Sequence, residues 1–416
     1  MAFYRHEMDE STAIRPYRIE IPQSDVDDLH ERLRRTRWPD FSAGPDWSRG
    51  VPPDYLEGLA EYWLNDFDWR AQEARLNEIP QFVTTVDGQD IHFFHVRSPE
   101  PDAMPLVVTH GWPSSSVEFL RVLAPLTDPH ASGGDSADAF DVVVPTLPGY
   151  GLSTPLHVGW GNLFQVAQAW AEIARRLGYE RYGLQATDAG AGVAGILAMI
   201  APDQVAGMHL TGTAAGTPFG PPLDPDDFEG EDRDRIVRFN AYRDEGLGYF
   251  HLQATRPQTI AYALTDSPVG QLAWIVEKFH EWTDPAAERP DDAVDRDQLL
   301  TNVSLNWFRQ AGATSAHSVY EGVQAWKHMA SGQADGSGNG SEGSDVPPGP
   351  PTGYAVFAAD TTVRSLADPD GRLAHWSNFD RGGHFPAMEV PGLWVTDVRE
   401  FFRPLRRSVN SGNSGT

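Results

Sequence analysis

One short stretch of the sequence combines a reactive side chain with the local pattern that would expose it. The segment 182–200, YGLQATDAGAGVAGILAMI, predicts a strand, a sharp turn and a helix, with Asp188 at the turn. Ala186 and Gly190, two positions to either side, are small, which a close strand–helix approach requires. A nucleophile at such a turn projects from the sheet edge, and the next backbone N–H, here that of Ala189, points at the reacting oxygen. The alternative is an Asp188 that only caps the helix.

The same stretch contains a glycine pattern found at nucleotide sites. Gly190, Gly192 and Gly195 spell GxGxxG. A dinucleotide site would also need an acidic residue at the end of the next strand, about 20 residues further on. That strand ends in HLTGT, without an acid. The sequence therefore disfavours a nucleotide site.

An acid and a histidine follow Asp188 in the chain order that a catalytic triad would have. Asp360 closes the strand GYAVFAAD, and His384 follows two glycines in GGHFPAMEVP, on a loop after a strand. Nucleophile, acid and histidine occur in this chain order in one class of hydrolases. Asp368 and Asp370 compete with Asp360 for the role of the acid, but they lie further into the loop.

An earlier motif can supply the second donor of an oxyanion hole. HGWP, at residues 110–113, closes a predicted strand and places the backbone N–H of Trp112 there, to act beside that of Ala189. A simple loop turn is the alternative for this motif taken alone. The complete set of motifs is far more specific than any one of them.

The elements that must position these residues alternate between strands and helices. Such alternation predicts an α/β fold with a mostly parallel central sheet flanked by helices, whose functional residues gather at the carboxyl ends of the strands. Before them, FVTTV and DIHFFHV around Asp87-Gly88 predict a hairpin, and Ser24 can cap a helix over 24–36. Apolar runs predict the other strands at 106–109, 140–144, 182–186, 205–210, 354–358 and 376–379.

These elements suggest a division of the chain into parts. A long helical stretch without strong strand signals interrupts the sheet pattern and predicts an inserted cap, and a Gly- and Ser-rich segment follows it. We expect an N-terminal extension at 1–80, the first part of the core at 81–212, a helical cap at 213–330 with a flexible loop at 331–351, the second part of the core at 352–408, and a disordered tail at 409–416.

Composition excludes several functions. The net charge of −27 repels nucleic acid and anionic membranes, and the absence of cysteine excludes disulfides, thiolate zinc sites and a cysteine nucleophile. The N-terminus lacks the apolar region of a signal peptide, and no run approaches the length of a membrane span. We therefore expect a cytoplasmic protein with no membrane anchor and no nucleic-acid partner.

Motifs spread nearly end to end resemble those of the microsomal-type epoxide hydrolase family. They include RLRRTRWPD, HGWPSSSVEF, PTLPGYGLS, YFHLQATRPQTIAYALTDSPVG, TNVSLNWF and GGHFPAMEVP. The resemblance implies the α/β-hydrolase fold with an inserted helical cap and an N-terminal epoxide-hydrolase extension. It implies Asp188 as nucleophile, His384 as the base that activates water, and Asp360 as the acid. Tyr249 in GYFHLQ and Tyr320 in SVYEG match the two cap tyrosines of the family.

The resemblance also implies a reaction. Asp188 would attack a small-molecule epoxide to form a covalent ester, and water activated by His384 would release a vicinal diol, with no metal or cofactor. The alternatives are a haloalkane-type dehalogenase on the same fold and a catalytically silent hydrolase fold that binds a ligand. A homodimer is left open.

The sequence departs from the family at two places. The family turn is usually G-G-D-W-G, whereas this chain has A-T-D-A-G, so Ala189 removes an indole from beside the nucleophile. The larger pocket predicts a bulky substrate, such as an aromatic or polycyclic epoxide. Asp360 stands where the family usually has a glutamate in F-P-x-E, and its side chain is one methylene shorter.

Overall fold

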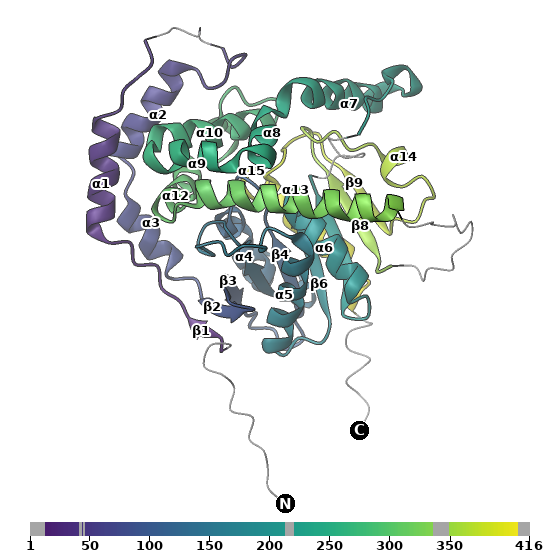
Figure 1. The fold of residues 1–416 in the computed structure, drawn as a ribbon. Helices are drawn as coiled ribbons and strands as arrows, with labels where there is room; N and C mark the ends of the chain where they lie inside the picture. Colours follow the sequence, from purple (N-terminus) through teal and green to yellow (C-terminus); the bar gives the residue numbers. More distant parts are fainter. Residues whose placement is uncertain (1–12, 41–43, 45, 213–219, 336–348, 407–416) are drawn as a thin grey trace, which may run out of the picture.

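A mostly parallel sheet forms the centre of the protein in the computed structural model, which describes residues 13–40, 44, 46–212, 220–335 and 349–406 (Figure 1). Within these residues the strands stand in the order β1-β2-β3-β5-β4-β6-β7-β8-β9. The pairs from β1 to β5 are antiparallel and the pairs from β5 to β9 are parallel, which confirms the predicted class. The strands are β1 Arg15–Pro16, β2 Gln81–Val86, β3 Gln89–Val96, β4 Met104–Thr109, β5 Phe140–Pro145, β6 Tyr182–Thr187, β7 Val205–Thr211, β8 Thr352–Val356 and β9 His375–Asn378.

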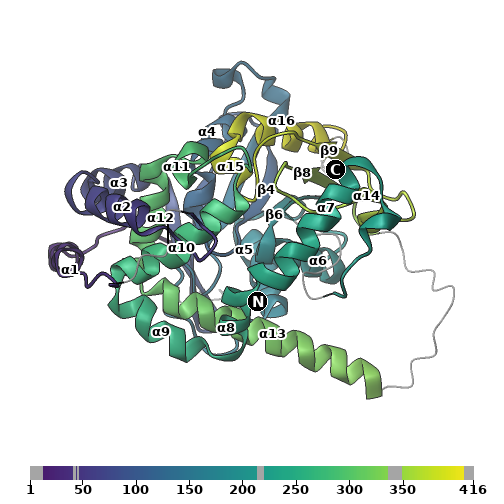
Figure 2. The same cartoon turned by 90° about the horizontal axis from the view of Figure 1, so that it is seen from above.

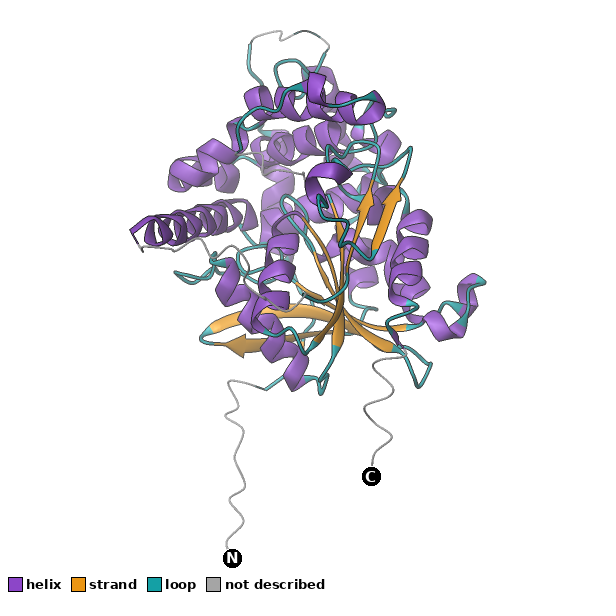
Figure 3. Ribbon diagram, turned by 90° about the vertical axis from the view of Figure 1, so that its right-hand side faces the viewer, coloured by secondary structure: helices purple, strands orange, loops and turns teal. Residues whose placement is uncertain are grey.

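Helices cover both faces of this sheet (Figures 2 and 3). Successive side chains of β4 point to opposite faces, so Leu106 joins one buried cluster with Phe402 of α16, and Val107 joins another with Trp170 of α5. The helices are α1 Gln23–Arg34, α2 Pro53–Asn65, α3 Trp69–Leu76, α4 Leu120–Thr127, α5 Leu163–Arg176, α6 Asp188–Ile200, α7 Gly230–Ala241, α8 Gly248–Thr255, α9 Pro257–Asp266, α10 Pro268–Trp282, α11 Pro290–Ala293, α12 Arg296–Phe308, α13 Ala311–Asp335, α14 Arg364–Ala367, α15 Pro386–Glu389 and α16 Pro391–Phe402.

Helices α7 to α13 lie between β7 and β8 in the chain and form a cap over one end of the sheet (Figure 1). One polar link joins this cap to the loop after β4. The amide of Asn302 in α12 donates to the carbonyl oxygen of Pro113 at 3.0 Å and accepts from the Ser115 hydroxyl at 2.8 Å. Both side chains are buried, so these bonds fix the cap against the loop that carries HGWP.

The N-terminal helices contact the cap, and α1 to α3 lie beside α9, α10 and α12 (Figure 1). The Trp63 indole donates to the Ser304 hydroxyl at 2.9 Å, and the Tyr62 hydroxyl donates to Asp297 at 2.8 Å. Arg32 pairs with Asp266 at 2.9 Å. Because β1 pairs with β2, the same segment also joins the edge of the sheet. The N-terminal part therefore connects the sheet edge to the cap.

Most predicted elements are present, with local corrections. The hairpin turn at Asp87 and Gly88 has positive φ at both residues, as a type I′ turn requires. Ser24 does not cap α1, which begins one residue earlier with Pro22 at the N-cap position. Helix α13 continues to Asp335, past residue 331, where the flexible loop was expected to begin. The rest of that expected loop at 336–348, and the tail at 409–416, lie outside the described residues.

Within the described part of the chain, none of the helices combines the length and the apolar character that crossing a membrane requires.

Candidate active site

Asp188 lies where β6 turns into α6, with a φ of +51° that non-glycine residues rarely adopt. Gly190 permits the tight approach, because a Cβ there would lie 2.5 Å from the carbonyl oxygen of Thr109. The carboxylate does not cap α6. Its Oδ1 instead accepts a hydrogen bond from the backbone N–H of Trp112 at 2.9 Å. This strained, outward placement favours a nucleophile over a helix cap.

Hydrogen bonds of His110 hold the loop after β4 and orient the Trp112 N–H. Leu147 N–H donates to Nε2 of the buried His110 ring at 3.1 Å, so Nδ1 carries the proton and donates to the Gly111 carbonyl at 3.0 Å. Burial lowers the pKa of His110 to about 4, which keeps this ring neutral and able to accept. The predicted donor Trp112 therefore lies at the nucleophile. Ala189, the other predicted donor, lines the cavity next to Asp188.

His384 reaches the nucleophile from the loop between β9 and α15. Its Nε2 lies 3.8 Å from Asp188 Oδ2 and makes no hydrogen bond within the described residues. Its backbone N–H donates to the Trp282 carbonyl at 2.7 Å, and Gly382 N–H donates to Asp284 at 2.7 Å, so the cap holds this loop. Burial lowers the pKa of His384, against the opposing charge of Asp188. A neutral imidazole in this place can accept a proton near neutral pH.

Asp360 lines the same cavity as His384, but its carboxylate is hydrogen-bonded to Thr362 and not to His384. Its Oδ1 accepts from the backbone N–H of Thr362 at 2.8 Å and from the Thr362 hydroxyl at 2.6 Å. No hydrogen bond joins Asp360 to His384 among the residues the structure describes. Burial raises the pKa of Asp360, although the Thr362 hydrogen bonds oppose the shift. Of the three acids considered from the sequence, Asp360 lines the cavity, and Asp368 and Asp370 do not.

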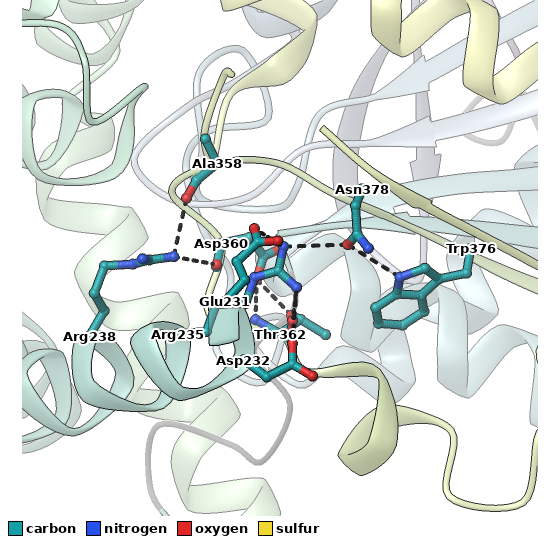
Figure 4. A network of polar contacts seen from close by, with 9 residues as sticks. All are labelled: Glu231, Asp232, Arg235, Arg238, Ala358, Asp360, Thr362, Trp376 and Asn378. Atoms are coloured by element: carbon teal, nitrogen blue, oxygen red, sulfur yellow. Dashed lines mark hydrogen bonds and ion pairs between the residues drawn. The ribbon is translucent and has the colours of Figure 1, made fainter. Parts of the chain in front are cut away.

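Two arginines of α7 hold the loop that carries Asp360 (Figure 4). Arg238 donates to the carbonyl oxygens of Ala358 and Asp360 at 3.3 and 3.4 Å. Arg235, almost fully buried, lies 3.5 Å from the carbonyl oxygen of Thr362. Its positive charge partly offsets the rise in the pKa of Asp360 that burial causes. The cap therefore contacts both the loop that carries Asp360 and the loop that carries His384.

The structure brings Tyr249 to the nucleophile. Its ring stacks on Trp112, with centroids 4.7 Å apart and planes inclined by 15°. Its hydroxyl lies 3.1 Å from the hydroxyl of Tyr242, a cap residue that the sequence analysis did not single out. Burial and the charge of Asp188 raise the pKa of both phenols, so both are protonated and able to donate.

Tyr320 is not brought to the cavity. It belongs to α13, whose residues Val319 and Val323 do line the cavity. Tyr320 itself is not among the residues that line the cavity. Of the two cap tyrosines that the resemblance implied, Tyr249 therefore lines the cavity, with Tyr242 as its neighbour, and Tyr320 does not.

The cavity between the cap and the strand ends is large, at about 1590 Å³. Aromatic rings form its inner wall, where Trp282 contacts Trp112, Tyr249 and His384 with centroids 5.8, 5.4 and 5.0 Å apart. Sequence reasoning missed Trp282 and Tyr242. Both are aromatic residues in helices, where helical periodicity alone does not distinguish a cavity wall from ordinary packing.

One cluster among the described residues has donor types that bind metals. His209, His375 and Asp397 offer ligand atoms within 4.8 Å of one another. Each histidine already bonds the carboxylate, at 2.8 and 2.9 Å, and none of the three lines the cavity. The cluster joins β7 and β9 to α16 through hydrogen bonds, so we interpret it as structural.

Comparisons with known proteins show which families the chain is similar to. A family model described as Epoxide hydrolase N terminus matches residues 14–119, and one described as alpha/beta hydrolase fold matches residues 104–270. A Stigmatella aurantiaca protein that carries an epoxide hydrolase name is 42% identical, covering 94% of this chain and 86% of that protein. Epoxide hydrolase 1 of Sus scrofa is 32% identical, covering 96% and 90%.

Two solved structures are similar along almost the whole chain. The juvenile hormone epoxide hydrolase of Bombyx mori has a TM-score of 0.81 at 26% identity, covering 97% of this chain and 96% of that one. The epoxide hydrolase of Aspergillus niger has a TM-score of 0.78 at 28% identity, covering 95% and 97%.

Proposed function

Because the chain belongs to the epoxide hydrolase family and has the α/β-hydrolase fold, we propose that it opens its substrate through a covalent ester of Asp188 that His384-activated water hydrolyses. The chain is an epoxide hydrolase, and its substrate is a small molecule. One observation carries the proposed mechanism. The two oxygens of Asp188 have different partners, Trp112 N–H at 2.9 Å and His384 Nε2 at 3.8 Å.

The first step is nucleophilic attack. Asp188 Oδ2 forms a bond to an epoxide carbon while the ring C–O bond breaks, and its electron pair stays on the epoxide oxygen. That oxygen takes a proton from a phenol of the cap, and the stacking of Tyr249 on Trp112 beside Asp188 supports Tyr249 as this donor. A carboxylate is a competent nucleophile because it is ionised at neutral pH, and a protonated phenol can donate at the same pH.

The second step is hydrolysis of the ester. Water gives a proton to His384 Nε2 and adds to the carbonyl carbon of Asp188. The negative charge that develops falls on the oxygen held by Trp112 N–H, with Ala189 N–H as the proposed second donor. The tetrahedral centre then collapses, the diol leaves with the proton from His384, and Asp188 is left as a carboxylic acid. Its proton returns to the phenolate formed in the first step, which restores Asp188 as a carboxylate.

Asp360 is our proposed acid of the triad. It follows β8, lines the cavity with His384 and would stabilise the imidazolium by turning from Thr362 toward the ring. Asp360→Asn should slow ester hydrolysis more than ester formation. Asp368→Asn, outside the cavity, is the matched control. Equal hydrolysis rates in the two variants would remove Asp360 from this role.

We also propose a bulky epoxide as substrate. The cavity of about 1590 Å³ greatly exceeds the space a small epoxide fills, and Ala189 adds little volume to its wall. The aromatic wall around Trp282 favours flat, apolar substrates.

A single turnover in ¹⁸O-labelled water, with enzyme in excess, tests the covalent route. Water attacks the ester carbonyl, so the label should enter the peptide that contains Asp188 and leave the diol mostly unlabelled. In His384→Gln the ring should still open, and intact mass spectrometry should find the enzyme heavier by one substrate. His130→Gln, an exposed histidine away from the site, is the control and should turn over normally. Labelled diol on the first turnover, with no adduct in His384→Gln, would show direct attack by water.

A further inference from the structure

Tyr242 occupies a place in the cavity that no role yet explains. It is the first residue of a π-helical turn, η6 (Tyr242–Gly246), between α7 and α8. It lines the same cavity as Asp188, and its hydroxyl lies 3.1 Å from that of Tyr249. Single π-helical turns inside helices occur often at functional sites.

The backbone around Tyr242 is shaped to hold its ring there. A Cβ at Gly246 would lie 2.4 Å from Cδ2 of Tyr242, so the ring lies directly against a residue that has no side chain. The ring also meets the Trp282 ring in an edge arrangement, with centroids 6.4 Å apart. These contacts help to hold the phenol where its hydroxyl meets that of Tyr249.

The two hydroxyls form a directional pair. Only one of two phenols joined by a hydrogen bond donates to the other, so the second O–H is free to donate to another acceptor. Tyr249 is the inner member, because its ring stacks on Trp112, whose N–H holds Asp188. The geometry thus allows Tyr242 to donate to Tyr249 while Tyr249 donates to the epoxide oxygen.

We propose that Tyr242 is a positioning residue for ring opening, acting through Tyr249 as the second phenol of the acid pair. This inference rests on the proposed covalent function. As Asp188 bonds to carbon, the epoxide oxygen takes the proton of Tyr249, and the Tyr242 O–H then donates to the phenolate that remains. After hydrolysis Asp188 is a carboxylic acid, and its proton returns to the pair. Epoxide plus water gives the diol with both phenols restored.

This role predicts which step fails when the hydroxyl is removed. Tyr242→Phe keeps the ring against Gly246 and removes the donor to a developing negative charge. A hydrogen bond to a charged group is worth enough to change a rate by about ten- to a hundredfold. The rate of Asp188 alkylation should fall by that factor, while hydrolysis of the ester, once formed, should keep its wild-type rate. A purely structural tyrosine would affect both steps or neither.

The experiment measures both steps by rapid-quench mass spectrometry with an aryl epoxide such as styrene oxide. The variants are Tyr242→Phe, Tyr249→Phe and Tyr320→Phe, with Tyr62→Phe in the N-terminal part as a control that loses a hydroxyl outside the cavity. Thermal denaturation of each variant shows whether it is folded. The inference holds if alkylation slows in the first two variants and not in Tyr62→Phe.

Two results would overturn it. One is alkylation at the wild-type rate in folded Tyr242→Phe. The other is a loss in Tyr320→Phe that exceeds the loss in Tyr242→Phe, because the acid pair would then be Tyr249 with Tyr320 after movement of α13. Failure of the covalent function itself would look different, since no variant, His384→Gln included, would accumulate an ester.

Discussion

Gly111 offers the sharpest test of how the nucleophile is held, because it has no room for a side chain. A Cβ added there would lie 2.2 Å from the Cβ of Asp188 and 2.4 Å from its Oδ1. Carbon atoms make favourable contacts at about 3.5 Å or more, so Gly111→Ala must separate the loop from Asp188 by more than about 1 Å. The hydrogen bond from Trp112 N–H, at 2.9 Å, cannot survive that separation unchanged.

The expected loss follows from these distances. A displacement of about 1 Å in a reacting group can cost about 10²-fold, and removal of one oxyanion donor costs about 10²- to 10³-fold. The two effects act on the same carboxylate and do not add fully, so alkylation and ester hydrolysis should each fall by about 10²- to 10³-fold. Overpacking typically costs about 1–3 kcal/mol of stability, which lowers the melting temperature without unfolding the protein at room temperature.

The assay is single-turnover alkylation and hydrolysis by rapid quench, beside thermal unfolding followed by circular dichroism. Gly58→Ala is the control, because Gly58 lies in the exposed part of α2 and an added Cβ meets nothing within 4 Å. Gly58→Ala should keep full activity. Near wild-type rates in folded Gly111→Ala would refute the close packing of the HGWP loop on Asp188.

Two other predictions concern acid stability and substrate size. Burial lowers the pKa values of His92, His95 and His110 to about 3, 4 and 4, so below the ordinary value of about 6.5 the unfolded state binds protons that the folded state does not. The stability from these histidines is therefore fully present above that pH, and each of the three should lose about 1.4 kcal/mol per pH unit near pH 5. Burial raises the pKa values of Glu118 and Glu389 to about 8, which acts in the opposite direction, so the net fall should be about 2 kcal/mol per pH unit. Urea unfolding across this range checks the slope, and a flat profile would contradict it. Ala189→Trp should reduce turnover of polycyclic epoxides about tenfold or more and that of small alkyl epoxides less; an equal loss on both would show that residue 189 does not limit the pocket.

Local patterns in the sequence were enough to predict the residues held by local structure. The turn at Asp188, the HGWP loop and the alternating strands depend on neighbours a few positions apart, so the spacing of small and apolar residues specifies them. Ser24 shows the limit even there, because Pro22 can start the helix without a side-chain cap.

Residues whose roles depend on packing between distant segments were harder to predict. Whether Tyr320 or Tyr242 faces Asp188 depends on the rotation of α13 and on the π-helical turn at η6, and neither is set by residues within a few positions. Asp360 was placed correctly at the cavity, but its hydrogen bond to Thr362 comes from the loop geometry after β8. The aromatic wall at Trp282 arises only when the cap meets the sheet.

The connection of the N-terminal helices to the cap has a consequence for how new substrates could be accommodated. The N-terminal segment binds the cap from one side through Trp63, Tyr62 and Arg32. Asn302 of the cap binds the loop after β4. A cap that is attached at several separated points resists rotation as a rigid body about a single hinge. Changes in substrate range should therefore arise from exchanging the side chains that face the cavity, and directed evolution of this scaffold would gain more from those positions than from the segments that join cap and sheet.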